Sequence, residues 1–128
     1  MALRDQLRII VVDDMSTSRG IITQALEAFG VRQIETASDG QDALQKISTW
    51  PVHLVISDMN MPGMNGLQLL HALRSTPQTR GVGFLLITGK ADREIIEYGK
   101  KLGMNNFVKK PFQLDQLRGA IEAIVGRL

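Results

Sequence analysis

The alternation of short apolar runs with longer amphipathic segments is the feature of this 128-residue sequence that most constrains its fold. The short runs lie at residues 8–12, 33–37, 53–57, 84–87 and 106–109. Three of them are apolar on consecutive residues, which is typical of strands that are covered on both faces of a sheet. The longer segments have a helical period and lie at residues 16–29, 39–49, 66–74, 92–102 and 113–125.

Five predicted strands, each followed by a predicted helix, indicate right-handed crossovers and an α/β fold. We expect a doubly wound five-stranded parallel sheet with five helices, because closing a barrel normally takes about eight such units. Asp39 and Asp92 stand where helix N-caps are expected. Gly30 and Gly103 stand where two of the helices should end.

The composition is that of one globular domain, with 44% hydrophobic and 22% charged residues. We interpret residues 1–128 as a single domain with no effector domain. The chain has no cysteine, which excludes disulfides and thiolate metal sites. Residues 1–8 lack the apolar core of a signal peptide, and no later stretch reaches membrane-spanning length. We therefore expect a cytoplasmic protein without membrane insertion.

Charge is distributed unevenly along the chain, although its net value is only +2. Residues 1–64 carry five Lys or Arg and eight Asp or Glu, whereas residues 65–128 carry ten and five. The small net charge gives no argument for a nucleic-acid partner. The unequal halves fit a cation site in the first and a surface for an acidic partner in the second, or simply an uneven solvated surface.

Reactive side chains follow four of the predicted strands. The first strand is followed by two carboxylates, the third by one, the fourth by a hydroxyl and the fifth by an ammonium. In chain order these are Asp13, Asp14, Asp58, Thr88 and Lys110. Open parallel sheets bind ligands outside the carboxyl ends of their strands, so we expect these groups to meet at one edge. Each alone could instead be a helix cap, a turn residue or a solvated side chain.

Together these groups have the chemistry of phosphoryl transfer. Three carboxylates at close range repel one another, and a divalent cation relieves the repulsion. Oxygen ligands without His or Cys favour Mg²⁺. A carboxylate beside the cation can attack phosphorus and form an acyl phosphate, while an ammonium and a hydroxyl contact the oxygens of the incoming group.

Several motifs then match a known family. They are VVDD at residues 11–14, DMNMPGMNG at 58–66, Thr88, KKPF at 109–112 and the pair Asp39-Gly40. With these motifs, nearly the whole chain resembles the bacterial response-regulator receiver domain, and within it the CheY-like single-domain chemotaxis regulators. The resemblance implies the flavodoxin-like strand order 2-1-3-4-5.

The resemblance also implies a role for each residue of the predicted edge. Asp58 is implied as the phosphoacceptor. The implied Mg²⁺ ligands are Asp13, Asp14, Asp58 and the backbone carbonyl of Asn60. Lys110 is implied as the ligand of a phosphoryl oxygen, and its bond to the following proline is expected to be cis.

A switch and a phosphodonor follow from the same resemblance. Thr88 is implied as the switch hydroxyl, and Phe107 as the aromatic side chain that turns inward with it. A sensor histidine kinase is the implied phosphodonor. The chain would catalyse only its own phosphorylation and dephosphorylation, so we expect a switch and not an enzyme. Lys90 stands where chemotaxis regulators often carry an acidic side chain, and we expect it to alter the lifetime of the phosphorylated state.

The implied output face is made by the fourth predicted helix, the fifth strand and the fifth helix. Its predicted contact residues are Arg93, Ile96, Lys100, Phe107, Lys109 and Phe112. Basic residues interspersed with apolar ones suit a short acidic amphipathic helix. The resemblance implies the N-terminal segment of a flagellar motor switch protein as the target. We expect the chain itself to be a monomer.

Other functions match parts of the pattern. Within the family, the chain could be a phosphate sink or phosphorelay intermediate that drains a shared kinase without binding the motor. An FMN-binding flavodoxin would need a hydroxyl- and glycine-rich phosphate loop where Asp13 and Asp14 stand. A hydrolase with an aspartyl-phosphate intermediate would need a D-x-D arrangement after the first strand, which the adjacent pair does not provide.

Overall fold

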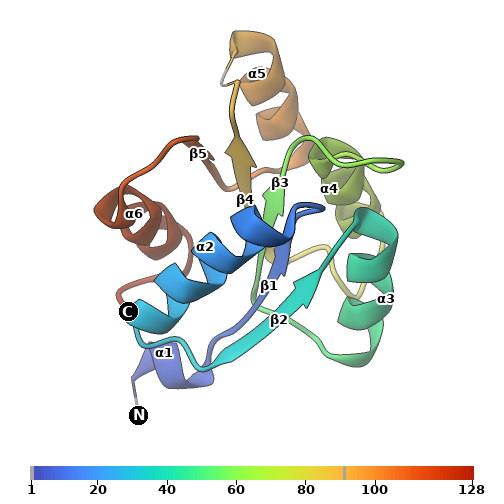
Figure 1. Cartoon of the computed structure of the whole chain (residues 1–128). Coiled ribbons are helices and arrows are strands. Elements are labelled where there is room, and N and C mark those ends of the chain that lie inside the picture. Colours follow the sequence, from blue (N-terminus) through green and yellow to red (C-terminus); the bar gives the residue numbers. More distant parts are fainter. Residues whose placement is uncertain (1, 91) are drawn as a thin grey trace.

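The computed structural model describes residues 2–90 and 92–128 and contains a five-stranded parallel sheet. The strands are β1 (Arg8–Val12), β2 (Gln33–Ala37), β3 (Leu54–Asp58), β4 (Gly83–Thr88) and β5 (Asn106–Lys109). Their order in the sheet is β2-β1-β3-β4-β5 (Figure 1). This order and the alternation of strands with helices confirm the predicted doubly wound α/β fold.

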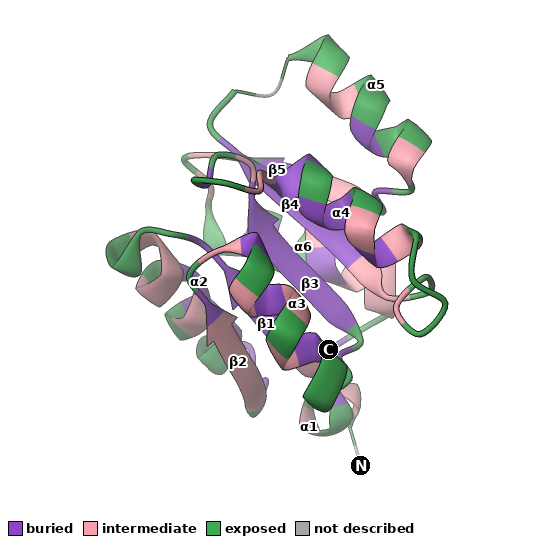
Figure 2. Cartoon of the chain, turned by 90° about the vertical axis from the view of Figure 1, so that its right-hand side faces the viewer, coloured by how far each residue is buried: buried purple, intermediate pink, exposed green. Residues whose placement is uncertain are grey.

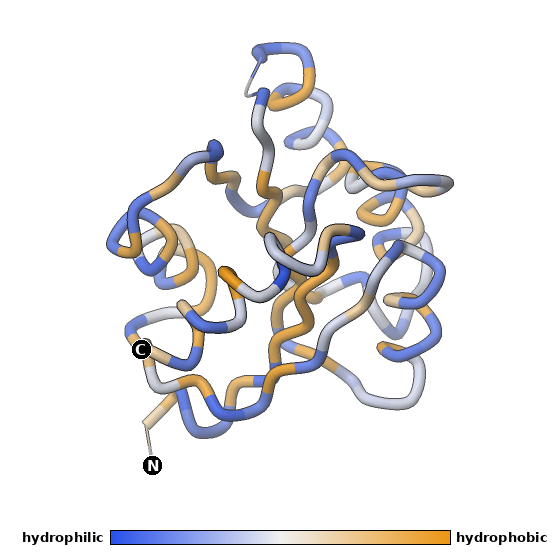
Figure 3. The backbone as a smooth tube through the Cα atoms, in the orientation of Figure 1, coloured by the Kyte–Doolittle hydropathy of each residue, from blue (hydrophilic) through white to orange (hydrophobic). Residues whose placement is uncertain are grey.

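Helices cover both faces of the sheet. The helices are α1 (Leu3–Gln6), α2 (Ser16–Ala28), α3 (Gly40–Thr49), α4 (Gly66–Arg74), α5 (Arg93–Leu102) and α6 (Leu114–Val125). One core cluster joins the sheet to α2 and α6, and a second joins it to α3 and α4, with α5 packed at its border. Neighbouring strand residues alternate between the two clusters, so Ile9 belongs to the first and Ile10 to the second. The apolar strands lie at the centre of the molecule (Figure 3).

Two strands are one residue longer at their carboxyl ends than the sequence pattern predicted. β3 ends at Asp58 and β4 at Thr88, which were both expected directly after their strands. Main-chain hydrogen bonds extend the ladder there, from Met59 N to Ile87 O at 2.9 Å and from Lys110 N to Thr88 O at 2.8 Å. Because the sheet continues through them, Asp58 and Thr88 are buried, with 8% and 1% of their surface exposed.

The short helix α1 was not predicted. It spans only four residues, Leu3–Gln6, and one turn is too short to show a helical period in the sequence. Its Leu3 packs against the α2 and α6 side of the core, and Leu7, directly after it, is buried. None of the helices in the described residues combines the length and the apolar character that crossing a bilayer would need.

The predicted helix ends are confirmed at several positions. The Asp39 carboxylate accepts from Asp42 N at 2.7 Å, and the Asp92 carboxylate accepts from Ile95 N at 2.8 Å. Each bond satisfies an amide of the first turn that has no partner within its helix. Gly103 ends α5 with φ +98°, a backbone conformation that favours glycine.

Helix α5 is the least embedded of the long helices. Gly99 is its one buried residue, and most of its surface is exposed or half-buried (Figure 2). Its C-terminal end is held by Arg74 of α4, whose guanidinium donates to Gly103 O at 2.9 Å and to Asn105 Oδ1 at 3.1 Å. No comparable bond joins the first turn of α5 to another element within the described residues. Hydrogen bonds to other elements therefore anchor α5 at its C-terminal end, while in the described part of the chain its first half is held by apolar contacts alone.

Candidate functional site

Three carboxylates meet at the carboxyl edge of the sheet, as the sequence predicted. Asp13 and Asp14 follow β1, and Asp58 ends the adjacent strand β3. One oxygen of each lies within 4.8 Å of the others. Asp13 is fully buried and Asp58 nearly so, whereas Asp14 is exposed to solvent. The strand ends therefore form an acidic site that is open on one side.

Lys110 reaches into this acidic site from the end of β5. Its Nζ lies 3.0 Å from Asp58 Oδ1 and 3.7 Å from Asp13 Oδ2. A third contact was not predicted, since Lys110 Nζ also donates to Ser18 Oγ of α2 at 3.1 Å. Ser18 lies 92 positions from Lys110, and no sequence signal links the two. The Lys110-Pro111 peptide bond is cis, as expected from the resemblance.

Burial dominates the electrostatics of Asp58. Loss of solvation raises the pKa of Asp58 above its ordinary value. The hydrogen bond and the charge of Lys110 lower this pKa, and the neighbouring charges of Asp13 and Asp14 raise it further, but burial is the largest cause. The ionised carboxylate of Asp58 is thus held at some energetic cost, which a positive charge at the site would offset.

The donor set fits a divalent cation. Asp13 Oδ1 accepts from Met15 N at 3.0 Å, whereas Asp13 Oδ2 is buried without a hydrogen-bond partner among the described residues. A buried carboxylate oxygen without a partner is costly in a folded protein. Oxygen ligands alone, in a group of three carboxylates, are the chemistry of a hard cation such as Mg²⁺. Asn60, exposed in the loop after β3, lines a hollow beside Asp14.

Thr88 lies at this edge, but its hydroxyl is held by its own loop. Thr88 Oγ1 donates to Lys90 O and accepts from Lys90 N, both at 3.1 Å. The side chain of Lys90, to which the sequence assigned an effect on the phosphorylated state, is exposed. The main chain of Lys90 is the actual partner of Thr88. The predicted effect of the Lys90 side chain on the phosphorylated lifetime stays a prediction.

The residues predicted for the output face do not all pack on one side of the sheet. Arg93, Lys100 and Lys109 are exposed, while Ile96 and Phe107 are half-buried against the α3 and α4 side of the core. Phe112 instead packs against the α2 and α6 side and lines a hollow with Ser18, Ile21, Ile22, Lys110 and Pro111. The sequence could not separate these two groups, because Phe107 and Phe112 are only five positions apart.

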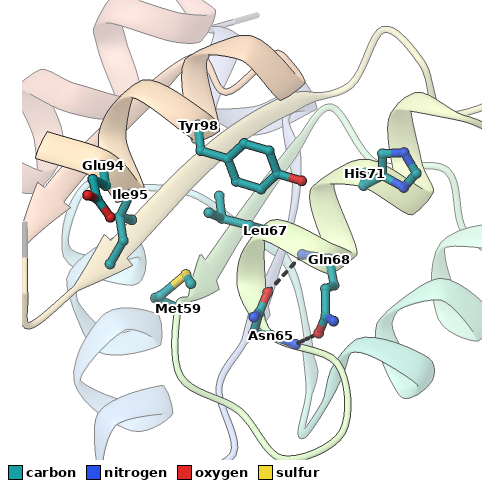
Figure 4. A pocket seen from close by; sticks show the side chains of 8 residues that line it. All are labelled: Met59, Asn65, Leu67, Gln68, His71, Glu94, Ile95 and Tyr98. Carbon is teal, nitrogen blue, oxygen red and sulfur yellow. Dashed lines mark hydrogen bonds between the residues drawn. The ribbon is translucent and has the colours of Figure 1, made fainter. Parts of the chain in front are cut away.

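A groove of ≈ 580 Å³ lies between α4 and α5 (Figure 4). Met59, Leu67 and Ile95 supply its apolar wall, and Tyr98 extends across it from α5. The capping box of α4, in which Asn65 and Gln68 exchange hydrogen bonds of 2.8 and 2.9 Å, closes one end. The groove borders the acidic site through Met59, which follows Asp58, and it leaves free space beside the weakly held helix.

Comparisons with known proteins agree with the motifs. The family model of the response regulator receiver domain matches residues 9–122. A probable chemotaxis protein CheY of Rhizobium etli is 38% identical over 128 residues, which cover 100% of this chain and 99% of the relative. The solved structure of chemotaxis protein CheY4 of Vibrio cholerae has a TM-score of 0.87 at 30% identity and covers 92% of this chain and 98% of its own.

A more distant structure shows likeness of fold alone. It is the receiver domain of a sensor histidine kinase from Pseudomonas aeruginosa PAO1, with a TM-score of 0.84 at 22% identity. The match covers 94% of this chain and 98% of that one. In that protein, a magnesium ion is coordinated in the active site cleft.

Proposed function

The chain belongs to the response regulator receiver domain family, and from that premise we propose that Asp58 accepts a phosphoryl group in a Mg²⁺-dependent reaction. The protein is a CheY-like chemotaxis response regulator, a signalling switch rather than an enzyme, and its family implies a histidine kinase as phosphodonor. We further propose that it acts in the cytoplasm as a stand-alone, monomeric receiver domain. Its phosphorylated form then binds a flagellar motor switch protein.

One observation supports the assignment of Asp58 above all others. Its carboxylate lies 3.0 Å from the Lys110 ammonium and belongs to the group of three carboxylates whose oxygens lie within 4.8 Å. Asp14 is exposed, and Asp13 Oδ1 is already engaged by Met15 N. Asp58 therefore combines a raised pKa with a cationic neighbour at hydrogen-bond distance.

The transfer can be written from the residues of the site. The Asp58 carboxylate attacks the phosphorus of the phosphohistidine, a P–O bond forms, and the P–N bond breaks with its electron pair left on the imidazole nitrogen. Lys110 carries a positive charge next to the oxygens of the transferring group. The Thr88 hydroxyl must exchange its bonds to Lys90 for one to the phosphoryl group.

The residues that would hold Mg²⁺ are the carboxylates of Asp13, Asp14 and Asp58, together with the main-chain carbonyl of Asn60. The ion supplies positive charge that offsets both the three carboxylates and the charge of the transferring phosphoryl group. The magnesium ion in the cleft of the P. aeruginosa receiver domain supports this assignment.

The proposed output uses α5, β5 and the start of α6. Release of the Thr88 hydroxyl from Lys90 changes the loop that leads into α5, a helix held mainly at its C-terminal end. Exposed Lys100 and Lys109, together with Arg93, which pairs with Glu97 at 3.0 Å, place cations on this face that suit an acidic amphipathic helix. A new charge of about −1.5 to −2 on Asp58 is the physical driver of the change.

Intact-mass analysis after incubation with acetyl phosphate and Mg²⁺ tests the phosphoacceptor. We expect wild type to gain one phosphoryl group and Asp58→Asn to gain none. Asp115→Asn is the matched control, because Asp115 is exposed and lies on α6. It should be modified like wild type. An unmodified wild type, or equal modification of Asp58→Asn, would contradict the proposal.

A pull-down with the N-terminal segment of a flagellar motor switch protein tests the output. Binding should strengthen when Mg²⁺ and beryllofluoride occupy the site of wild type. The Arg93→Glu, Lys100→Glu double variant should lose this gain, since it reverses two exposed charges of the face. If wild type binds equally with and without beryllofluoride, the chain is a phosphate sink or a relay intermediate, and the motor assignment fails.

A further inference from the structure

The contact between Lys110 and Ser18 is not explained by the roles given so far. Ser18 lies in the first half of α2, is half-buried, and accepts a hydrogen bond from Lys110 Nζ at 3.1 Å. We propose that Ser18 is a positioning residue that holds the Lys110 ammonium toward Asp58 and α2, and thereby keeps Asp13 Oδ2 free to bind the cation. This inference rests on the proposed function of the acidic site.

The state of Asp13 Oδ2 is the observation that requires an explanation. This oxygen is buried and makes no hydrogen bond within the described residues, although an ammonium lies only 3.7 Å away. An ammonium and a buried carboxylate attract each other strongly at such a distance. Some other contact must therefore hold Lys110 back.

The ammonium of Lys110 is held by the hydrogen bonds that its N–H groups donate to Asp58 and Ser18. Lys110 Nζ carries three N–H groups, and two acceptors lie at hydrogen-bond distance, Asp58 Oδ1 at 3.0 Å and Ser18 Oγ at 3.1 Å. The Asp13 oxygen at 3.7 Å is beyond that range. Ser18 thus gives the ammonium a second hydrogen-bond acceptor beside Asp58, without adding a charge of its own.

Ser18 is itself held in place relative to Asp13. The next residue, Arg19, donates from Nη1 to the main-chain oxygen of Asp13 at 2.7 Å. Both residues belong to α2, whose inner face is packed in the core through Ile22. The distance between Ser18 and Asp13 is therefore fixed by the helix and by the Arg19 bond. Ser18 can then act as a fixed anchor for a flexible side chain.

Loss of the anchor should let Lys110 compete with the cation. Without the Ser18 hydroxyl, the ammonium gains most by moving onto Asp13 Oδ2, which has no other partner among the described residues. Mg²⁺ must then displace it before it can bind there. We expect Ser18→Ala to weaken Mg²⁺ binding about tenfold, the change in affinity that corresponds to about 1.4 kcal/mol.

Isothermal titration with Mg²⁺ on the full chain measures this effect without any phosphorylation. Ser18→Thr retains the hydroxyl and should restore the wild-type affinity. Thr17→Ala removes a hydroxyl from the neighbouring exposed position of α2 and should leave the affinity unchanged. Equal Mg²⁺ affinity of Ser18→Ala and wild type would overturn the inference.

A double-mutant cycle separates positioning from a general effect on α2. In a Lys110→Ala background no ammonium can move onto Asp13, so adding Ser18→Ala should not change Mg²⁺ affinity further. If Ser18→Ala weakens binding equally in both backgrounds, the hydroxyl acts on the structure and not through Lys110. Thermal unfolding of each variant checks that it is folded. The cycle measures Mg²⁺ affinity alone, so it gives a result even if Asp58 is not phosphorylated. A failure of the Ser18 inference can therefore be told apart from a failure of the proposed function.

Discussion

The Lys110 side and the α5 side of the same sheet edge differ in how firmly their groups are held. Lys110 has partners at 3.0 and 3.1 Å on two different elements, and the carboxylates of Asp13 and Asp58 are buried. Across the edge, the Thr88 hydroxyl bonds within residues 2–90 and 92–128 to Lys90 alone, in its own loop, and the following helix buries only Gly99. The reactive groups are thus in place beforehand, while the helix that follows can be displaced at low cost.

Such a division suits a switch. A rigid site can carry out transfer without first reorganising, since its charges already face the reacting group. A loosely held helix needs little free energy to change position, so one new charge can shift its equilibrium. We call the Lys110 side the firm side and the α5 side the loose side. We expect substitutions on the firm side to change the chemistry of the acidic site as well as stability. Substitutions on the loose side should change stability and motion but not that chemistry.

Removal of Lys110 should have the largest effect, because Lys110 is the one cation paired with Asp58 in the part of the chain that the structure describes. We expect Lys110→Ala to lower the rate of phosphorylation by acetyl phosphate by about 10²-fold, a typical loss for one charge-stabilising group. Intact-mass time courses measure the rate. Lys109→Ala, an exposed neighbour, should keep the wild-type rate. A Lys110→Ala variant as fast as wild type would show that the firm side is not essential.

Removal of Arg74 should free the anchored end of α5. Its guanidinium donates to Gly103 O, Asn105 Oδ1 and Arg80 O, and Arg74→Ala should lower the free energy of unfolding by about 1–2 kcal/mol. Urea denaturation measures this, and amide exchange in the last turn of α5 should become faster. Arg93→Ala, which breaks an exposed pair with Glu97 at 3.0 Å, should cost only about 0.5 kcal/mol or less. Equal losses in both variants would remove the distinction between the two ends.

Neutralising Asp58, on the firm side, should stabilise the folded protein in the absence of Mg²⁺. Burial raises the pKa of Asp58 above 3.8, so the folded state binds a proton more tightly than the unfolded state does. The ionised carboxylate therefore lowers stability above the raised pKa, and this penalty fades as pH falls toward 3.8. Asp58→Asn should raise the free energy of unfolding at neutral pH by about 0.5–2 kcal/mol.

Thermal unfolding as a function of pH checks this sign. The advantage of Asp58→Asn should be largest at neutral pH and should shrink in acid. Saturating Mg²⁺ should stabilise wild type more than the variant, because the variant has lost one carboxylate ligand. A destabilised Asp58→Asn variant at neutral pH would mean that the Lys110 contact outweighs the cost of burial.

Apart from the control variants, the smallest effect is expected from Gly89, in the loop between Thr88 and α5. Gly89 does not adopt a positive φ, and a Cβ built there meets nothing within 4 Å. Gly89→Ala should therefore raise the free energy of unfolding by about 0.4–1 kcal/mol by reducing the freedom of the unfolded chain. Chemical denaturation measures the gain. A loss of stability would show that this loop is more constrained than the comparison implies.

Much of the site could be predicted because it depends on strand ends. Each apolar run marks where a parallel strand stops, and Asp13, Asp14, Asp58 and Lys110 follow directly from that pattern. The helix caps at Asp39 and Asp92 are local in the same way. The single turn of α1 gave no period, and it was missed.

Contacts across the fold were not predictable from the sequence. The bonds from Lys110 to Ser18 and from Arg74 to Gly103 depend on how separate helices pack. The separation of Phe107 from Phe112 depends on which face of the sheet each one meets. Periodicity shows that a residue is apolar, but it does not show which of two cores it joins.

Because hydrogen bonds anchor α5 at its C-terminal end, the helix can tilt about that end like a lever. A helix rises about 1.5 Å per residue, so ten residues form a rod about 15 Å long. A tilt of about 10° about Gly103 would displace the opposite end by roughly 3 Å, comparable to half a helical turn. Because the chain contains no cysteine, one introduced at the exposed Arg93, at the far end of α5 from Gly103, and another at the exposed Ile21 would be the only labelling positions. Spin-label distances between them would report the lever's amplitude directly.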